Sequence, residues 1–382
     1  MRTTRGKPTL DRSLEGEPAL ATAMATALQA LEQADRVTHG FHTYPAGLNP
    51  DAARDLLALF PGDSLHDPFC GGGTVLVEGL LAGRRVHGRD LSPIAQLVAR
   101  SRTRVASPEV LTQLRATARR LADVAKFAQT MPPGPILSVV GDWYEPHVLA
   151  ELEALRVGVR DAQVLDEARW LLWATFSSIV VKASFRASDT SSRREVHARP
   201  PETTAILFHK KSRELGRRLE ALAAAVPAGT PVADVGWGDA RQAPDIAPVD
   251  LILTSPPYPS VYDYLAVQDL RAAWMDVGLA ERQEIGPRRA FQELGSREAW
   301  RQWQADTHTW TRAVASRLRP GGHLVVVIGD GLVEEGTVPT WETTRAAAEA
   351  AGLRFRASAS LARPDPVRRA TRWEHALAFT RP

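Results

Sequence analysis

The sequence predicts an α/β protein with a seven-stranded, mostly parallel sheet, an antiparallel terminal hairpin and a helical insertion. Strand-like and helical segments alternate on both sides of the block 105–228, which is typical of a parallel sheet with helices on both faces. The last two strand-like segments, 354–361 and 374–380, have no helix between them and favour an antiparallel pair at one edge. The composition, 44% hydrophobic and 24% charged, is that of an ordinary globular protein.

Residues 1–35 are expected to form an N-terminal arm and a helix. Residues 1–17 are polar and contain Pro and Gly, whereas residues 18–35 have the Ala/Leu spacing of a helix. A loop of aromatics and prolines follows at 39–50. Either Asn49 or Asp51 can cap the short helix after this loop.

Residues 36–104 and 229–382 are expected to form the sheet and its covering helices. Short apolar runs between turn signals predict seven strands, at 64–68, 84–90, 231–239, 249–255, 322–331, 354–361 and 374–380. Capping and stop signals delimit the helices between them: Gly83 ends 74–83, Ser92 and Pro93 begin the next helix, and glycines close 305–322 and 341–352.

The block 105–228 interrupts this alternation because it is almost entirely helical in its spacing. It falls between the second and third predicted strands, so we interpret it as an insertion that supplies substrate recognition. Within it, residues 187–202 have no periodicity and are expected to form a loop.

Cysteine and hydropathy patterns limit the class of protein. Cys70 is the only cysteine, so no disulfide forms within the chain, and a reducing, cytoplasmic location is expected. The first residues lack the apolar segment of a secretory signal, and no apolar run is long enough to span a bilayer. The ten histidines show no metal-ligand spacing, so no metal is expected.

Positive charge is concentrated in the insertion. The chain has a net charge of +3, yet ten Lys/Arg face four Asp/Glu between Lys182 and Arg218, a local +6. Such a patch favours a polyanionic partner, although a solvated helix face is the simpler alternative. The candidates for phosphate contacts are Lys182, Arg186, Arg193, Arg194, Lys210, Lys211, Arg217 and Arg218.

The stretch HDPFCGGGTVLVEG, residues 66–79, indicates a nucleotide-type site. Glycines 71 to 73 allow a backbone to approach a ligand closely, and the helix that starts at Thr74 offers free N–H groups. Asp90, at the end of the next strand, can accept both hydroxyls of a ribose. A dinucleotide-binding fingerprint does not fit, because Leu76 stands where its third glycine belongs.

The second signal is TSPPY, residues 254–258, directly after an apolar strand. Prolines fix φ and have no N–H, so this backbone presents carbonyl groups in a rigid shape. A tight surface turn is the alternative interpretation of such a tetrapeptide. Its position downstream of the glycine turn makes a chance occurrence a poor explanation.

Together, DPFCGGGT and TSPPY resemble the amino-methyltransferases that use S-adenosyl-L-methionine, especially the cytosine-N4 and adenine-N6 DNA methyltransferases. The resemblance covers residues 39–104 and 231–382 and implies a Rossmann-like class I methyltransferase fold. It implies that Ser255, Pro256, Pro257 and Tyr258 are catalytic. It also implies cofactor contacts from Phe41, His42, Tyr44, Pro45, Asp67, Pro68, Phe69, Cys70, Gly71, Gly72, Gly73, Thr74, Asp90, Leu91, Asp239 and Ala240.

The chemistry of an exocyclic amine explains the diproline segment. The nitrogen lone pair is delocalised into the base, so acceptors on its N–H bonds are needed for it to attack the sulfonium methyl. In this interpretation Ser255 and the Pro256 carbonyl hold the amine, and Tyr258 stacks on the extruded base. Tyr262 and Tyr264 extend the stacking surface or simply pack. Carbon-5 methylation is excluded, because the only cysteine lies in the glycine turn.

The sequence constrains the methylated base less tightly than it constrains the reaction. In the family, Ser-Pro-Pro-Tyr occurs more often with cytosine N4, so DNA cytosine-N4 methylation is favoured, within a restriction–modification pair if a cognate nuclease exists. The position of the insertion is unusual for the DNA enzymes, which keeps adenine N6 and RNA amines as alternatives. An inactive binding subunit and a glutamine-amide methyltransferase also remain open.

Overall fold

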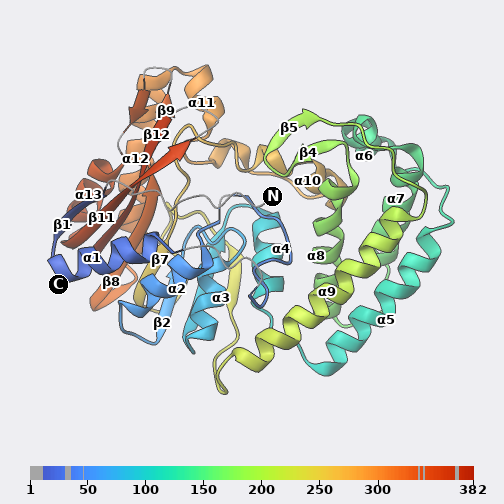
Figure 1. Cartoon of the computed structure of the whole chain (residues 1–382), viewed down its shortest axis with the longest axis horizontal. Helices are drawn as coiled ribbons and strands as arrows, with labels where there is room; N and C mark the ends of the chain where they lie inside the picture. The colour runs from blue at the N-terminus through green and yellow to red at the C-terminus, as the bar shows by residue number, and fades with distance from the viewer. Residues whose placement is uncertain (1–11, 31–35, 46, 334–335, 339, 366–369) are drawn as a thin grey trace, which may run out of the picture.

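The computed structural model describes residues 12–30, 36–45, 47–333, 336–338, 340–365 and 370–382. An eight-stranded sheet forms its centre (Figure 1), in the order β1-β11-β12-β8-β7-β2-β3-β6. Its strands are β1 (Arg12–Gly16), β2 (Ser64–Asp67), β3 (Arg85–Asp90), β6 (Asp234–Trp237), β7 (Val249–Thr254), β8 (Leu318–Gly329), β11 (Arg354–Asp365) and β12 (Ala370–Thr380). All seven predicted strands are present. The eighth, β1, corrects the expectation of a loose arm, because it pairs antiparallel with β11.

The strand order confirms the predicted Rossmann-like, methyltransferase-type α/β fold. Neighbours from β8 through β7, β2 and β3 to β6 are parallel. The chain runs from β2 to one edge and returns at β7 to continue toward the other, so the order reverses between β2 and β7. The terminal hairpin is antiparallel as predicted, with β12 between β8 and β11.

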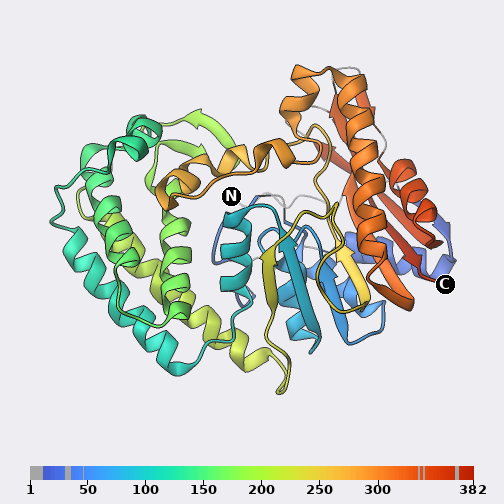
Figure 2. The ribbon, with the colours of Figure 1, turned by 180° about the vertical axis from the view of Figure 1, so that it is seen from behind.

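Helices cover both faces of the sheet because its strands are apolar on both sides. On β7, Leu251 and Leu253 belong to one buried cluster and Ile252 to the opposite one. The first cluster packs against α1 (Pro18–Leu28), α2 (Pro50–Ala58), α3 (Thr74–Leu81) and α4 (Pro93–Arg102). The second packs against α12 (Ser296–Ala315) and α13 (Trp341–Ala350), which Figure 2 shows on the other face. Asn49 and Ser92 cap α2 and α4 as predicted.

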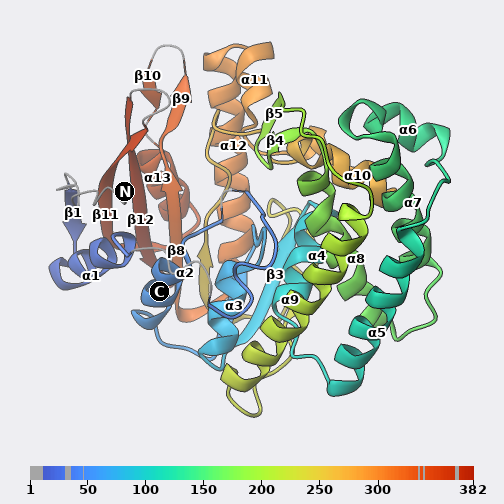
Figure 3. The same ribbon diagram turned by 45° about the vertical axis from the view of Figure 1, so that its right-hand side comes forward.

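The insertion forms a helical lobe beside the sheet (Figure 3). Its helices are α5 (Pro108–Ala125), α6 (Gly134–Val140), α7 (Pro146–Arg160), α8 (Asp166–Ala183) and α9 (Thr203–Ala225), with a 3-10 turn at Gly141–Trp143. The expected loop 187–202 is only partly irregular, because β4 (Arg186–Ser188) and β5 (Ser191–Arg194) form a small antiparallel hairpin. The lobe has its own apolar core, which also takes in Phe41, Leu270 and Trp274 from outside the insertion.

Shorter elements follow β7 and β8. They are 3-10 turns at Ala266–Gln268 and Glu281–Gln283, helices α10 (Asp269–Met275) and α11 (Arg288–Glu293), and the strands β9 (Gly331–Val333) and β10 (Gly336–Val338). Through the described part of the chain, we find no helix with the length and apolar character needed to cross a membrane.

Candidate active site

The two sequence motifs meet because the strands that precede them are neighbours. β2 and β7 run parallel, with Leu65 opposite Leu251 and His66 opposite Ile252. Ligands of such sheets bind beyond the carboxyl ends of the strands, where the strand order reverses. The motifs are also joined directly, because the Thr254 hydroxyl donates to Asp67 Oδ1 at 2.6 Å.

Both motifs line one cleft of about 490 Å³, within the size range of small-molecule sites. We refer to the lining residues of the glycine turn, with Asp67 and Asp90, as one wall of the cleft, and to the tetrapeptide with Arg363, Arg372 and Glu374 of the terminal hairpin as the other. From the predicted sites the cleft is lined by Tyr44, Pro45, Asp67, Phe69, Cys70, Gly71, Gly72, Thr74, Asp90, Ser255, Pro256, Pro257, Tyr258, Tyr262 and Tyr264.

The glycine turn needs glycine for steric reasons. Gly71 and Gly73 have φ of +48° and +81°, where side chains are disfavoured. A Cβ on Gly72 would lie 2.7 Å from the Arg102 guanidinium and 3.0 Å from Cβ of Tyr44. The turn is therefore packed closely against the loop that carries Tyr44.

Arg102, which sequence reasoning missed, fastens these two segments together. It is buried in α4, its Nη1 donates to the Gly72 carbonyl at 3.0 Å, and its Nη2 donates to the His42 carbonyl. Burial lowers its pKa to about 10. An arginine in the last turn of a helix has no sequence signal that separates this buried role from a solvent-exposed one.

Asp90 presents its carboxylate to the cleft in a fixed orientation. Its Oδ2 accepts from the Gly71 N–H and its Oδ1 from the Ser92 N–H, both at 2.9 Å. Burial raises the pKa of Asp90 to about 6 and that of Asp67 to about 7. Each Asp90 oxygen keeps a lone pair for another donor. This geometry fits the two hydroxyls of a ribose.

The start of α3 supplies a complementary group. Its N-cap is Gly73, and no side chain caps the free N–H groups there. A helix start of this kind favours an anionic group such as an amino-acid carboxylate. With Asp90 for a ribose, the residues of this wall fit S-adenosyl-L-methionine.

The tetrapeptide tyrosine lies between the sheet and the cleft. Its ring packs on Gly329 of β8, where an added Cβ would come within 2.6 Å of Cε2 of Tyr258. Its hydroxyl donates to Glu374 Oε1 at 3.4 Å, and its N–H donates to the Tyr264 hydroxyl at 3.4 Å. Burial, and then the charge of Glu374, raise the Tyr258 pKa well above its ordinary value, so the phenol is neutral.

The loop after the tetrapeptide is held by distant residues. Glu284 Oε1 accepts from the N–H groups of Tyr264 and Leu265. Asp263 Oδ1 accepts from the N–H of Arg289, in the first turn of α11, at 2.8 Å. These contacts fix the backbone at Tyr264 and tie the loop to α11.

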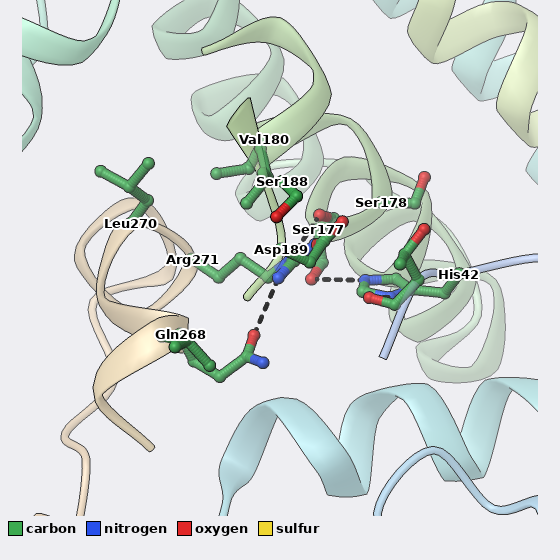
Figure 4. A network of polar contacts seen from close by, with 12 residues as sticks. His42, Ser177, Ser178, Val180, Ser188, Asp189, Gln268, Leu270 and Arg271 are labelled. Carbon is green, nitrogen blue, oxygen red and sulfur yellow. Dashed lines mark hydrogen bonds and ion pairs between the residues drawn. The ribbon is translucent and has the colours of Figure 1, made fainter. Parts of the chain in front are cut away.

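Several predicted cofactor residues do not reach the cleft. Phe41 is buried in the core of the helical lobe, and His42 Nε2 lies 3.0 Å from the Ser177 hydroxyl in a polar network (Figure 4). Asp239 is paired with Arg241 at 2.8 Å, and Ala240 is buried in the sheet core. Pro68, Gly73 and Leu91 do not line the wall either. The cofactor contacts that the sequence predicts for these residues stay a prediction, and the side chains of Phe41, His42 and Asp239 already have other partners.

The predicted phosphate contacts divide by exposure. Lys182, Arg193, Arg194, Lys210 and Arg217 are exposed. Arg186 is buried and forms a bidentate pair with Asp269, at 2.7 and 2.9 Å. Lys211 and Arg218 both bond Glu214. These last three side chains are engaged inside the protein, which argues against their predicted contacts with phosphate.

Two ion pairs attach the β4–β5 hairpin to the segment after the tetrapeptide. Arg186 pairs with Asp269, and Asp189 pairs with the fully buried Arg271 of α10. Arg271 also donates to the Ser177 carbonyl at 3.1 Å and to Gln268 Oε1 at 2.9 Å, so it links the lobe, the hairpin and α10 (Figure 4).

Comparisons with known proteins also indicate a methyltransferase. Residues 41–125 match the family model UPF0020, described as an RMKL-like methyltransferase domain. The chain is 27% identical over 160 residues to the type II methyltransferase M.MvaI of Kocuria varians, a match that covers 38% of this chain. It spans only 34% of that relative's length. These findings support an S-adenosyl-L-methionine-dependent methyltransferase.

Solved structures are also similar, at low sequence identity. TrmN from Thermus thermophilus matches with a TM-score of 0.34 and 14% identity, over 88% of this chain and 50% of TrmN. The rRNA methyltransferase aviRa from Streptomyces viridochromogenes matches with a TM-score of 0.32 and 14% identity, over 93% of this chain and 92% of aviRa.

Proposed function

We propose that this protein is an S-adenosyl-L-methionine-dependent methyltransferase that modifies an exocyclic base amine, cytosine N4 in DNA. The observation that carries the proposal is the single cleft shared by the glycine turn and the Ser-Pro-Pro-Tyr segment. A methyl donor on one wall and an amine on the other would then be within transfer distance. Such positioning supplies a large part of the rate of a transfer reaction.

The residues of the chain have distinct roles in this proposal. When bound, S-adenosyl-L-methionine supplies a methyl group activated by its sulfonium. Asp90 and the start of α3 would hold its ribose and carboxylate. Ser255 and the Pro256 carbonyl hold the amine, and the two prolines keep those acceptors rigid. Tyr258, backed by Gly329, stacks on the extruded base.

The choice of cytosine N4 depends on Ser255, since Asp or Asn is more frequent at this position in adenine enzymes. The match to a type II methyltransferase supports methyl transfer as the reaction, whereas the choice of cytosine rests on Ser255 alone. The exposed Arg193 and Arg194, on the hairpin that two ion pairs attach to α10, supply positive charge for the phosphate backbone. Adenine N6 in DNA and a base amine in RNA are the alternatives that the test below separates.

Mass spectrometry of nucleosides tests the proposal directly. DNA and RNA are digested from cells that express the protein and from cells that express Ser255→Ala. We expect N4-methylcytosine in DNA from the first cells only. N6-methyladenine, or a methylated base in RNA alone, would instead assign one of the two alternatives. No methylated base in either polymer would contradict the proposal.

Cofactor affinity is expected to depend on the ionisation of Asp90. Its pKa is about 6 in the free protein, and only the carboxylate accepts two ribose hydroxyls. Binding of S-adenosyl-L-methionine should therefore weaken as the pH falls below about 6, by up to about tenfold per pH unit. Asp90→Asn should bind about 10- to 100-fold more weakly at pH 8.

Calorimetric titration from pH 5 to 8 checks this expectation. In Asp90→Asn the change in cofactor affinity centred near pH 6 should disappear. Any pH dependence of the affinity that comes from Asp67, whose pKa is about 7, should remain. An unchanged pH profile in the variant would show that Asp90 does not bind the cofactor.

A further inference from the structure

A chain of polar side chains leads from the tetrapeptide to the terminal hairpin. The Tyr258 hydroxyl interacts with the Ser255 side chain and donates to Glu374 Oε1 at 3.4 Å. Arg363, on the neighbouring strand, binds the other oxygen of Glu374 through Nε at 2.9 Å and Nη2 at 2.7 Å. All four residues line the cleft, although they come from three separate segments of the sequence.

The proposed reaction releases a proton for which the tetrapeptide holds no strong base. Among the described residues that line the cleft, the carboxylates are Asp67, Asp90 and Glu374. Asp67 Oδ1 accepts from Phe69 and from Thr254, the residue before the tetrapeptide, and Asp90 accepts from Gly71 and Ser92. Of these three, Glu374 is the carboxylate that accepts from a side chain of the tetrapeptide itself, the Tyr258 hydroxyl.

We propose that Glu374 accepts the proton released by methyl transfer, through the hydroxyls of Ser255 and Tyr258. This inference rests on the proposed function. The amine nitrogen forms a bond to the methyl carbon with its lone pair, the carbon–sulfur bond breaks, and that electron pair stays on sulfur. The positive nitrogen then gives its proton to Ser255 Oγ, Ser255 gives its own proton to Tyr258 Oη, and Tyr258 gives its proton to Glu374.

The surroundings suit each member of the relay. The Tyr258 phenol is neutral, so it passes a proton on rather than holding a negative charge. Arg363 is a positioning residue, since it holds one carboxylate oxygen and leaves the other toward Tyr258. Its Nη2 also donates to the Leu28 carbonyl at 2.5 Å, which anchors the pair to α1. The carboxylate also stabilises the positive charge that develops on the amine.

Two conservative variants test the relay, Glu374→Gln and Tyr258→Phe. Each should lower the single-turnover methylation rate about 100-fold, and the double variant should fall no further, because one pathway is interrupted in all three. Affinities for S-adenosyl-L-methionine and for its demethylated product should stay within about threefold of the unmodified protein. Glu349→Gln, an exposed carboxylate on α13, is the matched control and should leave the rate unchanged. Additive losses would overturn the relay.

A binding measurement without turnover provides the second readout. 3-Methylcytosine carries a positive charge at neutral pH and imitates the cationic base. With the demethylated cofactor bound, the unmodified protein should bind a duplex with 3-methylcytosine at the target position more tightly than the same duplex with cytosine there. In Glu374→Gln this ratio of the two affinities should fall about tenfold. If the unmodified protein makes N4-methylcytosine while Glu374→Gln keeps both rate and preference, the relay is wrong and the proposed function stands. If the unmodified protein makes none, the proposed function itself fails.

Discussion

Replacing Tyr258 by alanine should lower turnover about 100- to 1,000-fold while cofactor affinity changes less than about threefold. The ring packs on Gly329 and lines the cleft as part of the tetrapeptide wall, whereas Asp90 belongs to the glycine-turn wall. Its removal takes away the stacking surface for the base, which is worth about 1–3 kcal/mol, together with the hydroxyl that contacts Glu374. Single-turnover kinetics and calorimetry with S-adenosyl-L-methionine measure the two effects separately.

The same substitution leaves a cavity beside Gly329, so stability must be measured alongside activity. Loss of a well-packed aromatic ring costs about 3–5 kcal/mol, which thermal unfolding would detect. Tyr258→Phe separates the contributions, because it keeps the ring and the packing and removes only the hydroxyl. Equal losses of turnover and cofactor affinity in Tyr258→Ala would assign the ring a folding role.

Reversing the charge of Arg193 and Arg194 together should weaken nucleic-acid binding about 10- to 100-fold at 0.1 M salt. Both side chains are exposed on β5, and the guanidinium of Arg194 lies 5.0 Å from the Phe185 ring, which restricts its movement. The hairpin that carries them is fixed to α10 by Arg186–Asp269 and Asp189–Arg271. Loss of two phosphate contacts should lower the slope of log affinity against log salt by about 2.

A matched variant controls for the change in net charge. Arg119 and Arg120 are exposed on α5, on the outer side of the helical lobe away from β4 and β5 (Figure 1). Arg119→Glu with Arg120→Glu changes the charge by the same amount and should alter affinity much less. Salt titrations of both double variants on one duplex make the comparison. Equal effects would indicate a general electrostatic contribution, and no effect in Arg193→Glu with Arg194→Glu would remove the hairpin from the proposed interface.

The periodicity of the sequence was sufficient to predict the strands of the sheet, because the turn residues that end each apolar run and the burial of that run in the structure agree. Apolar runs such as Leu251–Leu253 end at turn residues and pack helices on both faces, so the pattern has one interpretation. β1 was missed because Arg12–Gly16 is mostly polar and exposed. It is a strand because β11 offers it an edge to pair with, and no local pattern encodes that pairing.

The sequence by itself predicted the two motifs that line the cleft, because glycine and proline impose backbone preferences wherever they occur and an acid at a strand end supplies a hydrogen-bond acceptor. Only the tertiary structure decided which other side chains serve it. Arg102 of α4 binds the glycine turn, and Glu374 of β12 lines the cleft. By contrast, Phe41 and His42 pack in the helical lobe, and Arg186 and Lys211 form ion pairs. Backbone restrictions are local properties of a segment, but the partner of a charged or aromatic side chain depends on segments that only folding brings together.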